Sequence, residues 1–203
     1  MAVNAPSNWK SPIACARFLG VAAAGVAADL AVKYWAQSAL ALPDGSPSGK
    51  ILQIIPGWLC LEWTKNHGAA LGFFQGDRGM FMVVSFVAVG FLVHLFNTSR
   101  RRQWGYQIVL GMLLAGVLGN LYDRVVLGYV RDMIHIFPGV RWPDGIAAHL
   151  PGWWSTPEIF PWIFNIADSL LCVGVALMIL HSLIQPRASK PASENTVADG
   201  SPG

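Results

Sequence analysis

Four long apolar segments constrain the fold of this chain more than any other feature. They cover residues 12–35, 79–96, 104–122 and 162–184. Each is close to the length that a helix needs to cross a bilayer, about 20 residues. Charged residues are only 12% of the 203-residue chain, against roughly a quarter in an ordinary globular domain. The sequence therefore predicts an all-α polytopic membrane protein whose single membrane domain spans residues 1–185.

Basic residues predict the orientation of these helices. A cluster of three arginines, residues 100–102, lies in the short connection between the second and third segments, and such clusters stay cytoplasmic. Both termini are then cytoplasmic, and the polar residues 186–203 form a disordered tail. The net charge of +3 comes with no basic arm or phosphate-binding glycine loop, so we expect no nucleic-acid partner.

The two long connections, residues 37–78 and 125–161, then face outward. Within the first, an apolar stretch at residues 51–63 is broken by Pro56 and Gly57, which predicts two short strands joined by a turn. The second connection is rich in tryptophan and proline, and tryptophan favours the headgroup level of a membrane. We expect a small outward β-rich cradle and an interfacial loop.

The first apolar segment also fits a cleavable signal peptide, because it combines a basic start, a short apolar stretch and small residues. Asp29 and Lys33 favour a retained helix, since their spacing puts them on one helical face where they can pair.

Small residues recur at every fourth position in two of the segments. They are Gly20, Ala24 and Ala28 in the first, and Gly111, Ala115 and Gly119 in the third. This spacing predicts tight helix packing in lipid.

Acidic residues at the outer edges of apolar segments give the main indication of function. Asp132 and Asp168 occupy such positions, and a carboxylate near hydrocarbon normally faces a polar cavity or a partner. A helix starting at Trp162 would put Asp168 roughly 9 Å below the interface, with Asn165 on the same face. Arg131 is expected to point outward, because adjacent positions diverge.

Near the end of the third segment, Asn120, Asp123 and Arg124 would present an amide, a carboxylate and a guanidinium on one helical face. A helix end whose charges reach interfacial water is the alternative for the charged pair.

Neither histidine nor cysteine indicates a metal site. The five histidines lack the paired spacing of metal ligands. The three cysteines are odd in number and widely spaced, which indicates no disulfide framework and no zinc site. We expect no metal and no organic cofactor.

Five short motifs, taken in order, resemble the lipoprotein signal peptidases (signal peptidase II, or prolipoprotein signal peptidase). They are Asp29-xxx-Lys33, Asn66-His67-Gly68-Ala69-Ala70-Leu71, Gly119-Asn120-xx-Asp123-Arg124, Gly128-x-Val130-x-Asp132 and Phe164-Asn165-x-Ala167-Asp168. Each motif alone is common, but all five in this order are highly specific. The resemblance covers the four-helix core.

This resemblance implies an intramembrane aspartic endopeptidase of the bacterial cytoplasmic (inner) membrane. Such an enzyme removes the signal peptide from diacylglyceryl-modified prolipoproteins, cleaving before the lipidated cysteine, with its active site toward the outer leaflet. The implied partners are these substrates and membrane lipid, and we expect a monomer.

The matching positions also imply roles for individual residues. Asp132 and Asp168 would be the catalytic pair, sharing one proton. Substrate-binding or supporting positions would be Asn66, Gly68, Asn120, Arg124, Asn165 and Ala167, while Asp29, Lys33 and Asp123 would brace the site. Met133 departs from the family, in which phenylalanine usually follows the first aspartate, and the segment between the aspartates is longer than usual.

Two other classes of protein fit some of these features. A small proton-coupled membrane transporter also needs buried acids, although the chain shows no inverted repeat. A catalytically silent membrane assembly factor would not need both aspartates.

Overall fold

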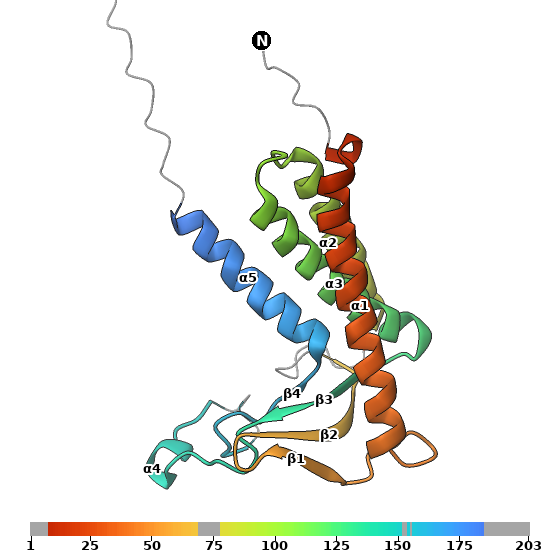
Figure 1. Cartoon of the computed structure of the whole chain (residues 1–203). Coiled ribbons are helices and arrows are strands. Elements are labelled where there is room, and N and C mark those ends of the chain that lie inside the picture. Colours follow the sequence, from red (N-terminus) through yellow and green to blue (C-terminus); the bar gives the residue numbers. More distant parts are fainter. Residues whose placement is uncertain (1–7, 69–77, 152–153, 155, 185–203) are drawn as a thin grey trace, which may run out of the picture.

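This computed structural model describes residues 8–68, 78–151, 154 and 156–184. Within them, four helices are long and apolar enough to cross a membrane, as expected. They are α1 (Pro12–Leu40), α2 (Arg78–Thr98), α3 (Trp104–Val126) and α5 (Ile166–Ile184). A small antiparallel sheet lies across one end of the bundle (Figure 1). Residues 186–203, the expected tail, lie outside the described part.

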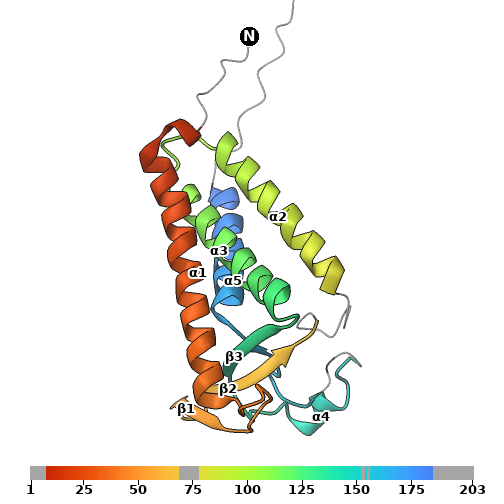
Figure 2. The same ribbon diagram turned by 90° about the vertical axis from the view of Figure 1, so that its right-hand side faces the viewer.

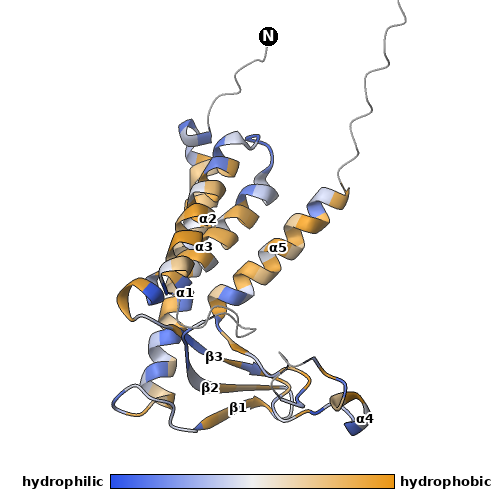
Figure 3. Cartoon of the chain, turned by 180° about the vertical axis from the view of Figure 1, so that it is seen from behind, coloured by the Kyte–Doolittle hydropathy of each residue, from blue (hydrophilic) through white to orange (hydrophobic). Residues whose placement is uncertain are grey.

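Helix α3 is the centre of the bundle. It is the most buried of the four helices and packs against α1, α2 and α5. Figure 2 shows it enclosed by its neighbours, whereas α2 leans outward. Apolar residues dominate the helices along their length (Figure 3). Large apolar side chains such as Phe86, Val87 and Leu183 are exposed, as expected where helices face lipid.

Glycines allow α3 to approach its neighbours closely. A Cβ atom at Gly111 would lie 2.6 Å from the Phe18 carbonyl of α1, and one at Gly116 would lie 2.6 Å from the Ala167 carbonyl of α5. Gly111, Ala115 and Gly119 are all buried. The packing role expected for this stripe is therefore confirmed.

The matching stripe on α1 does not pack, so that prediction is wrong. Gly20, Ala24 and Ala28 are exposed, and nothing lies within 4 Å of a Cβ placed at Gly20. The helix instead turns toward α3 the face that carries Asp29 and Lys33. This orientation of α1 has the lower free energy, because a charge exposed to lipid costs about 2.5–3.5 kcal/mol on insertion scales. Packing the small residues inward would expose that pair.

The sheet has the order β1-β2-β3-β4. Its strands are β1 (Ile51–Ile55), β2 (Leu59–Asn66), β3 (Val130–Ile136) and β4 (Ile163–Phe164). The predicted hairpin is confirmed: the Trp58 N–H donates to the Ile55 carbonyl at 3.0 Å, and Gly57 has φ +75°. That positive φ is the conformation that a type II turn requires after proline.

The second outward connection contains more regular structure than expected. Strand β3 puts Asp132 in the middle of the sheet, and β4 occupies the residues where the fourth helix was expected to begin. Because α5 starts only at Ile166, the depth predicted for Asp168 from a helix beginning at Trp162 is wrong. Short helix α4 (Asp144–Ala147) lies in the loop between these strands.

Candidate active site

Asp168 is fixed by the first turn of α5. Its backbone N–H donates to Asn165 Oδ1 at 2.9 Å, and its Oδ2 accepts from the Asn165 N–H at 3.3 Å. These reciprocal bonds make a capping box. The expected proximity of Asn165 and Asp168 is therefore present, but it arises from a helix cap and not from a shared helical face.

Asp132 enters the same region from the sheet. Its Oδ2 accepts a hydrogen bond from Asn66 Nδ2 at 2.9 Å, and its Oδ1 accepts one from Asn165 Nδ2 at 2.6 Å. Asn66, at the end of β2, is held in turn by the Gly68 N–H, which donates to Asn66 Oδ1 at 3.0 Å. Both carboxylate oxygens of Asp132 are therefore held by amide donors.

Asn120 of α3 joins the two aspartates into one network. Its Nδ2 donates to Asp168 Oδ1 at 2.7 Å, and its Oδ1 accepts from Asn165 Nδ2 at 3.1 Å. Lys33 Nζ also donates to Asn120 Oδ1, at 3.0 Å. The orientation of the Asn120 amide is thus determined on both sides.

The electrostatic environment of Asp132 favours its protonated form. Burial, and then the nearby charge of Asp168, raise the pKa of Asp132 to about 7, although the hydrogen bonds from Asn66 and Asn165 act in the opposite direction. Two carboxyl groups that interact in this way hold one proton between them more readily than none. At neutral pH the pair can therefore both donate and accept a proton.

A pocket of about 530 Å³ opens beside this pair. Its polar lining comes from Asn66, Asn120, Arg124, Asp168 and Ser169. Its apolar lining is largely aromatic and includes Phe81, Phe160, Trp162 and Phe164. Asp132 is only 1% exposed and is hydrogen-bonded to Asn66, which lines the pocket.

Arg124 lies at the wall of this pocket. Its guanidinium lies over the Phe81 ring, 4.8 Å from the centroid, and Nη1 donates to the Asn120 carbonyl at 3.4 Å. The alternative, in which the charge of Arg124 reaches interfacial water, does not apply, because Arg124 lines the pocket.

Four fully buried charges form a second network behind the aspartates. Lys33 Nζ lies 2.7 Å from Asp29 Oδ2 and 3.2 Å from Asp123 Oδ2, and Arg131 Nη2 lies 2.7 Å from Asp123 Oδ1. The set has no net charge. Asp29 Oδ1 also accepts the Ala167 N–H at 2.9 Å, which ties α1 to the first turn of α5.

Arg131 is the charged residue whose position the sequence did not predict. It points away from Asp132, as adjacent strand positions do, but it is fully buried and not outward. Its guanidinium lies 4.3 Å from the Tyr34 ring centroid. A strand prediction for residues 130–136 would have placed it opposite Asp132 and so against the helices.

The predicted site residues gather at the end of the bundle that carries the sheet. Ala69, Ala70 and Leu71, which complete the second motif, lie outside the described residues. Met133 is buried against Trp63 and Leu40, so it fills space in the core between the sheet and α1.

Comparison with known proteins identifies the family. A family model described as signal peptidase (SPase) II matches residues 21–184. A lipoprotein signal peptidase of Anaeromyxobacter sp. is 38% identical over 131 residues, which are 62% of this chain and 54% of that protein. One from Streptococcus pyogenes (serotype M5) is 31% identical over 155 residues, covering 76% of this chain and 85% of the relative.

The fold has solved counterparts as well. A bacterial membrane enzyme solved by the in meso method is 28% identical, with a TM-score of 0.64, covering 84% of this chain and 92% of that one. This likeness and the family match favour a peptidase over the proton-coupled transporter. The chain belongs to the signal peptidase II family of multi-pass membrane peptidases.

Proposed function

We propose that the protein is an aspartic endopeptidase that removes the signal peptide from diacylglyceryl-modified prolipoproteins, cleaving before the lipidated cysteine. The observation that carries this proposal is the connection of Asp132 and Asp168 through the linked side-chain amides of Asn165 and Asn120 beside a largely apolar pocket. The names of the relatives supply the substrate class.

In the proposed reaction the two aspartates share one proton. One carboxyl group donates a hydrogen bond to the scissile carbonyl, while the other removes a proton from the attacking water. The tetrahedral intermediate then collapses as the leaving nitrogen is protonated. The pKa of about 7 at Asp132 supports this scheme, because a carboxyl group whose pKa lies near the working pH can serve as either acid or base.

Asparagine and arginine side chains would keep the reacting groups in place. Asn120 and Asn165 orient the two carboxyl groups, and the guanidinium of Arg124, at the pocket wall, would donate to the peptide backbone. The aromatic wall of the pocket suits apolar side chains and acyl chains. Asp29, Lys33 and Asp123 brace this arrangement from behind, and Gly68 and Ala167 position backbone N–H groups.

We propose that one membrane domain, residues 1–185, acts as a monomer in the bacterial cytoplasmic membrane. The arginines at residues 100–102 connect α2 and α3 at the end of the bundle opposite the sheet (Figure 1). If that end is cytoplasmic, both termini are cytoplasmic and the pocket lies toward the outer leaflet. No metal or organic cofactor has a role in this reaction.

The experiment is a cleavage assay with detergent-purified protein. Two prolipoprotein substrates are compared, one carrying diacylglycerol on the cysteine and one carrying a free thiol, and the products are identified by mass. The proposal predicts cleavage immediately before the lipidated cysteine and little or none of the unmodified substrate.

Two results would contradict this proposal. Equal cleavage of both substrates would contradict the proposed specificity. No cleavage of either by folded protein would favour the silent assembly factor.

A further inference from the structure

Helices α3 and α5 separate toward the end of the bundle opposite the sheet (Figure 1). Midway along α5 they are still in close contact, since a Cβ atom at Gly174 would lie 2.7 Å from the Leu113 side chain. Farther from the sheet, the rings of Tyr106 and His181 stack with their centroids 5.8 Å apart. A pocket of about 570 Å³ lies between the helices beside this ring pair. We refer to it as the α3–α5 groove.

The lining of the α3–α5 groove is apolar at one end and polar at the other. Its apolar wall comes from both helices and includes Ile108, Met112, Leu177 and Met178. The other end is lined by Arg102, Gln103 and Trp104, where α3 begins. Between Trp104 and Met112 the helix rises about 12 Å. The groove therefore matches a ligand with a polar head and a long apolar chain.

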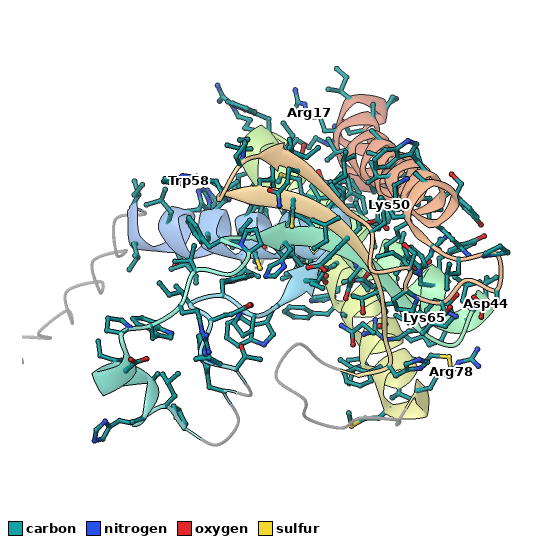
Figure 4. All side chains as sticks on the ribbon, turned by 90° about the horizontal axis from the view of Figure 1, so that it is seen from below. Arg17, Asp44, Lys50, Trp58, Lys65 and Arg78 are labelled. Carbon is teal, nitrogen blue, oxygen red and sulfur yellow. The ribbon has the colours of Figure 1, made fainter. Side chains whose placement is uncertain are left out.

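The charged side chains at this end of the bundle all have the same sign. They are Lys10, Arg17, Arg100, Arg101 and Arg102. The described residues 8–28, 79–122 and 169–184 contain no aspartate or glutamate. By contrast, the sheet end, which Figure 4 shows from below, carries Asp44 as well as Lys65. The end that holds the α3–α5 groove therefore attracts anions.

Arg102 brings this positive charge to the groove itself. Within the part of the chain that the structure describes, its guanidinium has no hydrogen-bond or ion-pair partner. Trp104, at the same end of the groove, is exposed, and tryptophan favours the headgroup level of a membrane. A basic pocket between membrane helices is typical of sites that bind anionic lipid headgroups.

We propose that the α3–α5 groove binds one anionic phospholipid from the leaflet at this end of the bundle. The phosphate accepts hydrogen bonds from Arg102, and one acyl chain lies along the apolar wall. A pocket of this volume suits a single chain, whereas a helix from another protein, about 10–12 Å in diameter, needs more room. A lipid that contacts both helices holds the end of α5 to α3 and stabilises the folded state. The site does not depend on the proposed function.

The test is native mass spectrometry of delipidated protein in detergent, titrated with phosphatidylglycerol or with phosphatidylcholine of the same acyl chains. The wild type should retain one phosphatidylglycerol per chain and bind it about fivefold more tightly than phosphatidylcholine, the factor expected for one basic group at an anionic headgroup. Arg102→Gln should remove this preference. Gly105 lines the groove, and a Cβ there meets nothing within 4 Å, so Gly105→Leu should fill the groove without a clash and weaken the binding of both lipids.

Matched controls separate this site from general attraction to the arginine cluster. Arg101→Gln changes an exposed neighbour that does not line the groove, and Gly90→Leu changes a glycine of α2 where a Cβ also meets nothing within 4 Å. Both should bind lipid as the wild type does. Equal binding of the two lipids by the wild type, or an equal loss in Arg101→Gln and Arg102→Gln, would overturn the proposal. A lipid-free dimer that Gly105→Leu disrupts would also overturn it and assign the groove to a second copy of the chain. Because the readout is lipid binding, failure here is distinguishable from failure of the peptidase assay.

Discussion

The two buried charge networks of this protein are built differently. In the network of Asp29, Lys33, Asp123 and Arg131, each carboxylate contacts at least one cation, and all four side chains are fully buried. In the pair of Asp132 and Asp168, the partners are asparagine amides. The first network is electrically neutral, whereas the second brings two acids together.

This difference distinguishes a network that stabilises the fold from a pair of acids that can exchange protons. The first network pairs opposite charges and holds α1, α3, β3 and the start of α5 together. In the second, burial and then the charge of Asp168 disfavour ionisation of Asp132. Perturbed acids of this kind are typical of functional sites.

The largest expected effect comes from breaking the neutral network. Arg131→Met leaves part of the Asp123 carboxylate without its partner in a buried site, and removal of one member of such a pair typically costs about 3–5 kcal/mol. Thermal or denaturant unfolding in detergent measures the loss. The double variant Asp123→Leu with Arg131→Met, which removes both charges, should recover much of it. A single variant as stable as wild type would show that the network does not hold the fold.

Next in size is the effect of removing the amide that links the two networks. Asn120→Ala takes a donor from Asp168 and an acceptor from Lys33, and loss of one well-placed donor costs about 10²–10³-fold in kcat. Unfolding should change far less than in Arg131→Met. Ser182→Ala, on an exposed turn of α5, is the control. An unchanged kcat in Asn120→Ala would show that the hydrogen bond to Asp168 is not needed for catalysis, and would contradict the role proposed for Asp168.

A smaller effect is expected from moving α5 without touching a charge. Gly116→Ala brings a Cβ to 2.6 Å from the Ala167 carbonyl, so α5 must shift and carry Asp168 with it. Misplacement by about 1 Å can cost 10²-fold in rate, and we expect a loss of roughly tenfold. Gly20→Ala, where nothing lies within 4 Å, should keep full activity. Equal rates for the two variants would show that the position of Asp168 tolerates the shift.

The smallest effect is a change in pH dependence. Because Asp132 has a pKa raised to about 7, the shared proton is lost as pH rises beyond that value, and the rate should fall there. The hydrogen bond from Asn66 lowers this pKa. Asn66→Ala should therefore move the fall to higher pH, by up to about one unit. A shift to lower pH would contradict the assignment of the shared proton.

The sequence predicted the helices and the first hairpin well, because both leave local signals. Four apolar segments gave the helices within a few residues at most ends. The hairpin at residues 51–63 was marked by its proline and glycine. These features depend on neighbouring residues alone.

The rest depends on contacts between distant residues. Strand β3 is buried on both faces, with Arg131 and Asp132 among its buried residues, so it lacks the alternation that marks a half-buried strand. Strand β4 has two residues and exists through its pairing with β3. The exposed stripe at Gly20 could not be distinguished from a packed one, since burial of Asp29 and Lys33 decides which face of α1 turns inward.

The most direct test of the account is the cleavage rate of Asp132→Asn and of Asp168→Asn. Each rate is measured on diacylglyceryl-modified prolipoprotein and compared with the wild-type rate. Each variant must also unfold at the same temperature as the wild type, so that a loss of activity is not a loss of folding. The account predicts no detectable product from either variant, because neither can hold and release the shared proton. Cleavage at the wild-type rate by either folded variant would contradict it.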